Sequence, residues 1–113
     1  MKTKIHKQTK EIMPSLNKFK SEIQDLYNEK LVSLVLYGSY ARGTATKFSD
    51  IDILLVLNDM NSPYEEINTT SEITINYLLD NDLNISIVPT TKKRLEEEKL
   101  SFYRIIKEEG ILL

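Results

Sequence analysis

The sequence predicts an α/β fold in which a small, mixed, partly parallel sheet is flanked by helices. Three apolar runs, at residues 31–37, 51–57 and 83–88, have the length and the branched side chains typical of β-strands. Amphipathic segments precede or separate these runs, and such alternation is typical of α/β proteins. The chain of 113 residues has no internal repeat and no linker, so we expect one domain over residues 1–113.

Residues 8–29 are predicted to form an amphipathic helix. Apolar side chains recur there every three or four positions and define one buried stripe, which consists of Ile12, Leu16, Phe19, Ile23, Leu26 and Tyr27. Pro14 has no N–H to donate and is best tolerated in the first turn of a helix. We therefore expect the regular part of this helix to begin near Met13.

The first strand and the turn after it come next. Residues 31–37 are almost wholly apolar, which predicts a central strand covered on both faces. Gly38 and Ser39 end this strand, and residues 40–43 resemble a single helical turn that Gly43 closes. Residues 51–57 are the second predicted strand.

A second long helix is predicted to start at Ser62-Pro63-Tyr64-Glu65. Ser at the cap, Pro at the first position and Glu three residues after the cap are three separate signals for a helix start. This helix is expected to run to about Leu79. Its predicted buried residues are Ile67, Leu78 and either Thr74 or Ile75.

The remaining segments predict a strand, a helical region and an edge strand. Asp80-Asn81-Asp82 is a predicted turn, and the strand at 83–88 is expected to stop at Pro89. Thr90 or Thr91 can cap a last helical region that ends at Gly110. Its two charged clusters, Lys92-Lys93-Arg94 and Glu96-Glu97-Glu98, are predicted to face solvent. Its apolar cluster is predicted to cover the sheet and consists of Phe102, Ile105 and Ile106. Residues 111–113 could add a short edge strand.

Composition excludes several classes of function. The net charge of −2 gives no general attraction to nucleic acid, and no apolar stretch approaches the roughly 18 residues that span a bilayer. The absence of cysteine excludes disulfides, thiolate metal sites and cysteine nucleophiles. The basic N-terminal residues lead into no apolar signal core, so we expect a cytoplasmic protein. His6 lies in this segment and is expected to be a bystander.

The most informative motif is a Gly-Ser turn followed by two aspartates. Gly38 lets the backbone approach a phosphate closely, and the Ser39 hydroxyl and the Arg42 guanidinium can bind the same group. Asp50 and Asp52 are two residues apart, so on a strand both project from one face. Adjacent carboxylates repel each other, and hard oxygen ligands suit Mg²⁺ or Mn²⁺. The pattern predicts a site for a polyphosphate and a divalent metal.

Two segments, Gly38-Ser39-Tyr40-Ala41-Arg42-Gly43 and Ser49-Asp50-Ile51-Asp52-Ile53-Leu54, resemble the minimal nucleotidyltransferases of the DNA polymerase β superfamily. The resemblance implies transfer of a nucleoside monophosphate from a triphosphate, usually ATP, to a hydroxyl. It also implies that Gly38 and Ser39 hold the triphosphate and that Asp50 and Asp52 ligate the metals. Many such chains resemble the antitoxin of a toxin–antitoxin pair, whose partner is a HEPN ribonuclease; some add AMP to a tyrosine of the toxin.

One feature departs from this family. Its members usually carry a third carboxylate on a later strand, where it binds metal and helps to deprotonate the acceptor. Here the alternation of the 82–88 segment places Asp82, Asn84 and Ser86 on one face. The expected position is Asn84 or Ser86, neither of which is anionic; Asp82 serves only if the strand begins earlier. Without this group, general-base assistance worth on the order of 10²–10⁴ in rate is in doubt.

Several alternatives stay open from the sequence alone. Arg42 is a phosphate clamp or a surface cation, and Tyr37 and Tyr40 pack or stack on a base. Lys47 is expected to be a solvated charge. The favoured function is a Mg²⁺-dependent adenylyltransferase with a macromolecular acceptor. The alternatives are a degenerate transferase that neutralises a partner by contact, and a small-molecule transferase, which would be expected to carry a further helical domain.

Overall fold

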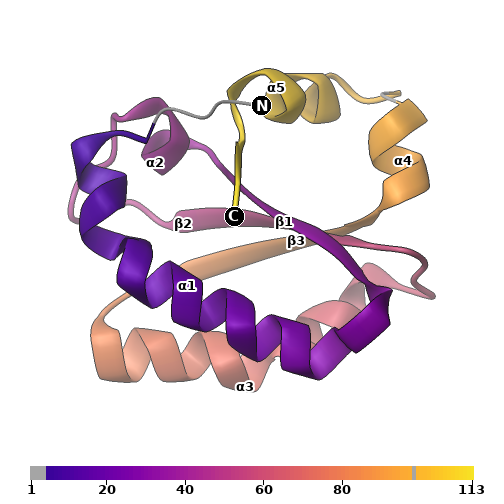
Figure 1. Cartoon of the computed structure of the whole chain (residues 1–113), viewed down its shortest axis with the longest axis horizontal. Coiled ribbons are helices and arrows are strands. Elements are labelled where there is room, and N and C mark those ends of the chain that lie inside the picture. The colour runs from indigo at the N-terminus through magenta and orange to yellow at the C-terminus, as the bar shows by residue number, and fades with distance from the viewer. Residues whose placement is uncertain (1–4, 98) are drawn as a thin grey trace.

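The computed structural model describes residues 5–97 and 99–113, and the predictions for residues 1–4 and Glu98 lie outside this range. Helices and strands alternate along it, as predicted (Figure 1). They are α1 (Lys7–Tyr27), the 3₁₀ turn η1 (Asn28–Lys30), β1 (Leu31–Tyr37), α2 (Ser39–Arg42), β2 (Ile51–Leu57), α3 (Pro63–Asn81), β3 (Ile85–Thr91), α4 (Lys92–Glu97), α5 (Ser101–Glu109) and β4 (Ile111–Leu112).

The strands of the described residues form one mixed sheet in the order β3-β2-β1-β4. β1 is antiparallel to β2 and to β4, whereas β2 and β3 are parallel and are joined through α3. The predicted α/β class with a partly parallel sheet is therefore confirmed. β1 and β2 occupy the centre of the sheet, which explains why their sequences are almost continuously apolar.

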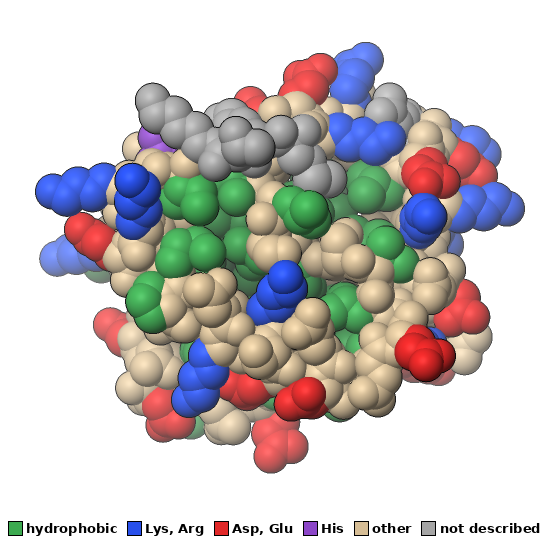
Figure 2. Space-filling view, in the orientation of Figure 1, with side chains coloured by type: hydrophobic (Ala, Val, Ile, Leu, Met, Phe, Trp, Pro, Cys, Tyr) green, Lys and Arg blue, Asp and Glu red, His purple; other side chains and the backbone are tan. Residues whose placement is uncertain are grey.

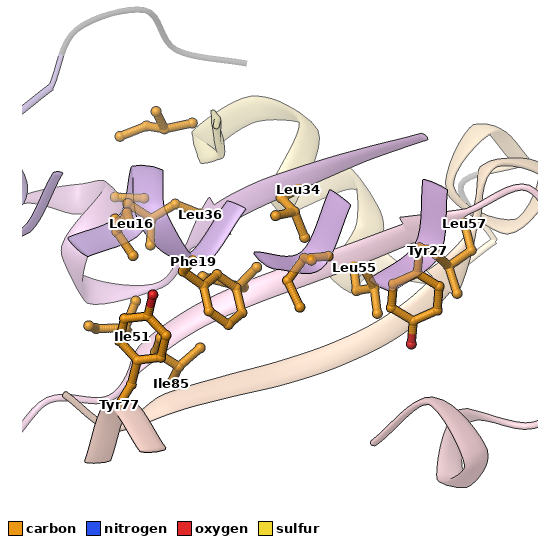
Figure 3. Close-up of a cluster of buried hydrophobic side chains, with 14 residues drawn as sticks. Leu16, Phe19, Tyr27, Leu34, Leu36, Ile51, Leu55, Leu57, Tyr77 and Ile85 are labelled. Atoms are coloured by element: carbon orange, nitrogen blue, oxygen red, sulfur yellow. The ribbon is translucent and has the colours of Figure 1, made fainter. Parts of the chain in front are cut away.

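Helices cover both faces of the sheet (Figure 1). α1 and α3 pack on one face over a cluster that includes Phe19, Leu36 and Leu55, and Figure 3 shows side chains of this cluster converging between the helices and the strands. α4 and α5 pack on the other face, where Leu95 and Ile106 meet alternate residues of β1 and β2. The prediction that residues 31–37 are covered on both faces is confirmed for Leu34, Val35 and Leu36, which are buried, but not for Val32, which is 39% exposed.

The start of α1 was predicted wrongly. The helix begins at Lys7, so Pro14 lies inside it and not in its first turn. Tertiary hydrogen bonds hold the turns before the proline: Gln8 Nε2 donates to the Ala45 carbonyl at 2.6 Å, and Thr9 Oγ1 to the Tyr40 carbonyl at 2.6 Å. These contacts offset the hydrogen bond that Pro14 cannot make. Most of the predicted stripe is buried, but Leu26 is 40% exposed.

The buried face of α3 also differs from the prediction. Its predicted core residues Ile67, Ile75 and Leu78 are each more than 40% exposed, and Thr74 is half-buried. The helix instead buries Glu66, Thr70 and Tyr77. Polar groups on α1 make this face suitable for burial, because Tyr77 Oη donates to Glu22 Oε1 at 2.6 Å and Tyr27 Oη to Glu66 Oε1 at 3.4 Å. Satisfied polar pairs, rather than the count of apolar residues, decide the orientation of α3.

The last third of the chain contains two further differences. β3 begins at Ile85 and continues through Pro89 to Thr91, because it pairs only with β2 and an edge strand tolerates a missing N–H. The predicted last helical region is divided into α4 and α5. Thr91 caps it as predicted, through Arg94 N–H to Thr91 Oγ1 at 3.2 Å.

The surface carries both acidic and basic side chains. Figure 2 shows Lys, Arg, Asp and Glu side chains around the margin of one face, with hydrophobic side chains nearer its middle. No helix among the described residues is both long and apolar enough to cross a bilayer.

We expect Thr9→Val to lower the free energy of unfolding by about 1–3 kcal/mol, because it removes the donor to the Tyr40 carbonyl from a fully buried position. Urea denaturation measures this change. The matched control is Thr69→Val, whose hydroxyl bonds within α3 at an exposed position, with an expected effect of about 0.5 kcal/mol or less. Equal effects of the two variants would show that the α1–α2 hydrogen bond adds nothing to stability.

Candidate functional site

The predicted Gly-Ser turn lies at the end of β1 and leads directly into α2. Gly38 has φ of 74°, a conformation that side chains with a Cβ rarely adopt. Its carbonyl accepts hydrogen bonds from the N–H groups of Ala41 and Arg42, both at 3.1 Å. Gly43 closes the turn with φ of 78° and donates to the Ser39 carbonyl, as predicted.

Asp52 lies directly against this turn. It pairs with Tyr37 across the antiparallel β1–β2 ladder, which places its side chain beside Gly38. A Cβ on Gly38 would collide with Oδ2 of Asp52. Glycine is therefore required at position 38 both for its backbone conformation and for the space that the carboxylate occupies.

Asp50 and Asp52 project toward the same face of β2, and each has a different environment. Partial burial raises the pKa of Asp52, the nearby Asp50 carboxylate raises it further, and Arg42 acts in the opposite direction. Asp50 is exposed, and its Oδ1 accepts a hydrogen bond from Asn84 Nδ2 at 2.7 Å. The two acids are close enough to repel each other, a cost that a bound cation would remove.

Ser86 occupies the position beside Asp52 on the neighbouring strand. The parallel β2–β3 register pairs Asp52 with Ser86, whereas Asn84 precedes β3 and contacts Asp50. Asp82 is the C-cap of α3 in a left-handed conformation with φ of 56°, and it is not on the strand. Of the three residues considered from the sequence, Ser86 thus lies where a third carboxylate would flank Asp52.

The donor set suits a divalent cation that takes part of its coordination from a substrate. Asp50 and Asp52 supply hard oxygen ligands, and no Lys or Arg of the described residues forms an ion pair with either. Among residues 5–97 and 99–113, no three acidic, histidine or cysteine side chains form a metal-binding group. The chain's own residues therefore fit Mg²⁺ or Mn²⁺, with further ligands from water and phosphate.

Arg42 lies beside the turn and is paired with an acid that the sequence did not reveal. Its guanidinium is 3.6 Å from Glu109 Oε2, and its side chain is about half exposed. It is also near enough to Asp52 to oppose the rise in that group's pKa. Glu109 lies at the end of α5, 67 residues along the chain from Arg42, and no local pattern in the sequence could have indicated this pair.

Other residues near the site have structural contacts. His6 packs against the turn, so that a Cβ on Gly43 would lie 2.6 Å from its Cγ. Thr46 and Ser49 hold the loop before the acids through Thr46 N–H to Ser49 Oγ at 2.9 Å. Lys47 is exposed, as predicted, and its Nζ lies 5.0 Å above the Phe48 ring.

The structure brings five predicted site residues to one end of the sheet. Gly38, Ser39 and Arg42 belong to the turn and α2; Asp50 and Asp52 belong to the start of β2 and the residue before it. The contact between Gly38 and Asp52 joins the two groups directly. The arrangement can hold a phosphate chain and a divalent cation side by side.

The chain is similar to a known protein family and to named relatives. Residues 16–113 match the family described as nucleotidyltransferase domain. A Methanocaldococcus jannaschii protein named as a putative protein adenylyltransferase is 32% identical over 101 residues, covering 89% of this chain and 97% of that protein. Another protein of that organism with the same assignment is also 32% identical over 74 residues, but this chain spans only about half of its length, 49%.

Solved structures share the fold. A crystal structure of a toxin–antitoxin with AMP-PNP has a TM-score of 0.61 at 23% identity, covering 85% of this chain and 69% of that chain. A mutant of the toxin–antitoxin MntA–HpeT has a TM-score of 0.60 at 20% identity, with the same coverage of both chains. At this level of identity, the likeness concerns the fold.

We expect Asp52→Asn to raise the unfolding temperature of the metal-free protein at pH 7 by a few degrees. The fold raises the pKa of Asp52 above its ordinary value of 3.8, so the ionised carboxylate opposes folding at neutral pH. This penalty disappears as the pH falls through the raised pKa, so the difference between the variants should shrink in acid. Thermal unfolding across this pH range measures both effects.

Added Mg²⁺ should stabilise the wild-type protein but not Asp52→Asn, because only the former keeps both carboxylates. Asp82→Asn is the matched control, since Asp82 caps α3 outside the site and should leave the Mg²⁺ response intact. Equal stabilisation of wild type and Asp52→Asn by Mg²⁺ would contradict the assignment of Asp52 as a metal ligand.

Proposed function

The chain belongs to the nucleotidyltransferase domain family, and we propose that it transfers AMP from ATP to a hydroxyl group of a protein partner. The contact of Asp52 with the Gly38 turn carries this proposal, because the acid proposed to bind metal lies against the turn proposed to bind phosphate. The assignment of related proteins as adenylyltransferases supports AMP as the transferred group.

Each residue of the turn has a distinct role in the proposal. Gly38 and Ser39 hold the triphosphate through the backbone and the Ser39 hydroxyl, in the absence of a Cβ that would keep the phosphates away. Arg42 exchanges part of its interaction with Glu109 for a phosphate oxygen, since its 3.6 Å pair is half exposed and easily rearranged. These contacts orient the α-phosphate toward the acids.

Asp50 and Asp52 hold Mg²⁺ or Mn²⁺ in the proposed site. When bound, the cation supplies charge neutralisation for the phosphates and for the pyrophosphate leaving group. Asn84 keeps Asp50 in position through its 2.7 Å hydrogen bond. The contact of the partly buried Asp52 with Gly38 restricts its side chain, so that in the proposal both acids face the phosphate chain.

The residue beside Asp52 determines which acceptors are suitable. Ser86 is neutral at pH 7 and cannot take a proton as a carboxylate would. An acceptor hydroxyl with a low pKa depends less on such help, and the tyrosine hydroxyl, with a pKa of about 10, is the most acidic hydroxyl among protein side chains. The proposed acceptor is therefore a tyrosine.

The surroundings of the acids favour a macromolecular acceptor. A recess of about 380 Å³ beside Asp50 is lined by Asn84, Ser86 and residues of α3. The α3 side chains next to it include Ile67, and the same helix exposes Ile75 and Leu78. Exposed apolar side chains on the helix that lines this recess suit a protein partner, and the proposed partner is a HEPN-type toxin for which this chain is the antitoxin.

A second candidate function follows from Ser86. With only two acids, the chain could bind a nucleotide, turn it over very slowly and neutralise its partner by contact alone. Transfer and contact are separable by experiment, because only transfer requires Asp52.

We expect ATP labelled at the α-phosphate, together with Mg²⁺, to label the protein encoded by the neighbouring gene. Asp52→Asn should reduce this labelling at least a hundredfold, because it removes a metal ligand, while Asp82→Asn should label at the wild-type rate. Autoradiography and mass spectrometry of the partner measure the product and its site. Full neutralisation of the partner in cells by Asp52→Asn, without any labelling, would favour contact alone and contradict the transferase.

We expect Ser86→Asp to increase AMP transfer at least tenfold, because it adds a carboxylate beside Asp52. Binding gives an independent measurement: Mn²⁺ titrated by electron paramagnetic resonance, in the presence of a non-hydrolysable ATP analogue, should bind more tightly or at a further site. Ser86→Asn is the control, because asparagine has nearly the same size as aspartate but carries no charge. If Ser86→Asp and Ser86→Asn behaved alike, position 86 would not be the place of the missing acid.

A further inference from the structure

We propose that the base of the bound nucleotide lies in an aromatic recess between the end of β1, α2 and α5. The inference rests on the proposed function, which places the triphosphate at Gly38. It assigns the nucleobase, for which the sequence left Tyr37 and Tyr40 as open alternatives, to a defined pair of aromatic side chains, Tyr37 and Phe102.

The recess has a volume of about 210 Å³ and a largely apolar wall. Tyr37, Phe102, Ile105 and Ile106 form this wall, and Arg42 and Glu109 lie at its edge. Pockets that enclose whole drug-sized ligands have volumes of roughly 300–1,000 Å³, so this recess suits one part of a nucleotide. A flat aromatic base is the part that matches an apolar wall.

The recess adjoins the acid pair directly. Its lining includes Gly38, which contacts Asp52, and Tyr37, which pairs with Asp52 across the β1–β2 ladder. Arg42 at its edge is close enough to affect the pKa of the same carboxylate. A nucleotide whose phosphates lie at Gly38 can therefore place its base here without leaving the site.

The aromatic side chains are arranged to receive a further ring. Tyr37 and Phe102 meet edge to face, with ring centroids 5.4 Å apart and an interplanar angle of 90°. Phe102 remains 37% exposed, although α5 buries its neighbour Ile106 almost completely. A partly exposed aromatic ring beside a phosphate-binding turn is a suitable stacking surface, because every nucleobase has an aromatic face.

The other recesses near the site fit this assignment less well or serve another group. The recess that includes Tyr40 is lined by α1 and the loop at residues 45–47, and neither acid lines it. The recess beside Asp50, Asn84 and Ser86 lies along β3, whereas the aromatic recess lies along β1. Since β1 and β3 flank β2 on opposite sides, base and acceptor approach the acids from opposite directions.

The test compares how ATP and tripolyphosphate bind, each with Mg²⁺, by isothermal titration calorimetry. Phe102→Ala should weaken ATP binding about tenfold and leave tripolyphosphate binding unchanged, because only ATP carries a base to stack. Tyr64→Ala is the matched control: Tyr64 is 79% exposed at the start of α3 and should leave both affinities unchanged.

A measurement on the wild-type protein tests the base assignment even if Phe102→Ala fails to fold. Nuclear Overhauser contacts between the adenine protons and the ring protons of Phe102 or Tyr37 are expected in the ATP complex. Unchanged ATP affinity in Phe102→Ala, or absence of these contacts, would overturn the base assignment and leave the proposed function standing. Failure of the wild-type protein to bind either ATP or tripolyphosphate would overturn both.

Discussion

The antiparallel pairing of β1 with β2 is the constraint on which the site depends. It sets Asp52 opposite Tyr37 and presses the Asp52 carboxylate against Gly38. The same carboxylate is partly buried and lies near Asp50, so both effects raise its pKa and oppose its ionisation. A carboxylate that disfavours the metal-free fold at the proposed binding site is an example of the usual trade between stability and function.

The two central strands and the start of α3 at Pro63 could be predicted to the residue, whereas the start of α1 and the buried face of α3 could not. Leu34, Val35 and Leu36 of β1 and nearly all of β2 are buried, so an apolar run is enough to predict these two strands. The start of α1 depends instead on Thr9 bonding to Tyr40, and the orientation of α3 on Tyr77 bonding to Glu22. Such long-range contacts leave no periodic pattern, and they override local rules about proline and apolar spacing.

The candidate site divides in the same way. Gly38, Ser39 and the two acids form a local motif, and the structure brings them together as the motif indicates. The surroundings come from distant segments: Asn84 contacts Asp50, Ser86 pairs with Asp52, and Glu109 meets Arg42. Alternation left three residues open for the third acid, and only the register of the parallel strands distinguishes Ser86 from Asp82.

The closeness in sequence of the two central strands has a kinetic consequence. β1 and β2 are joined by a short segment that contains α2, so closing this loop costs little conformational entropy. The parallel strand β3 can pair with β2 only after the longer connection through α3 has formed. The Gly38–Ser39 turn and Asp52 therefore lie in the part of the chain best placed to nucleate folding. The proposed site and the earliest long-range contacts of the chain thus depend on the same few residues.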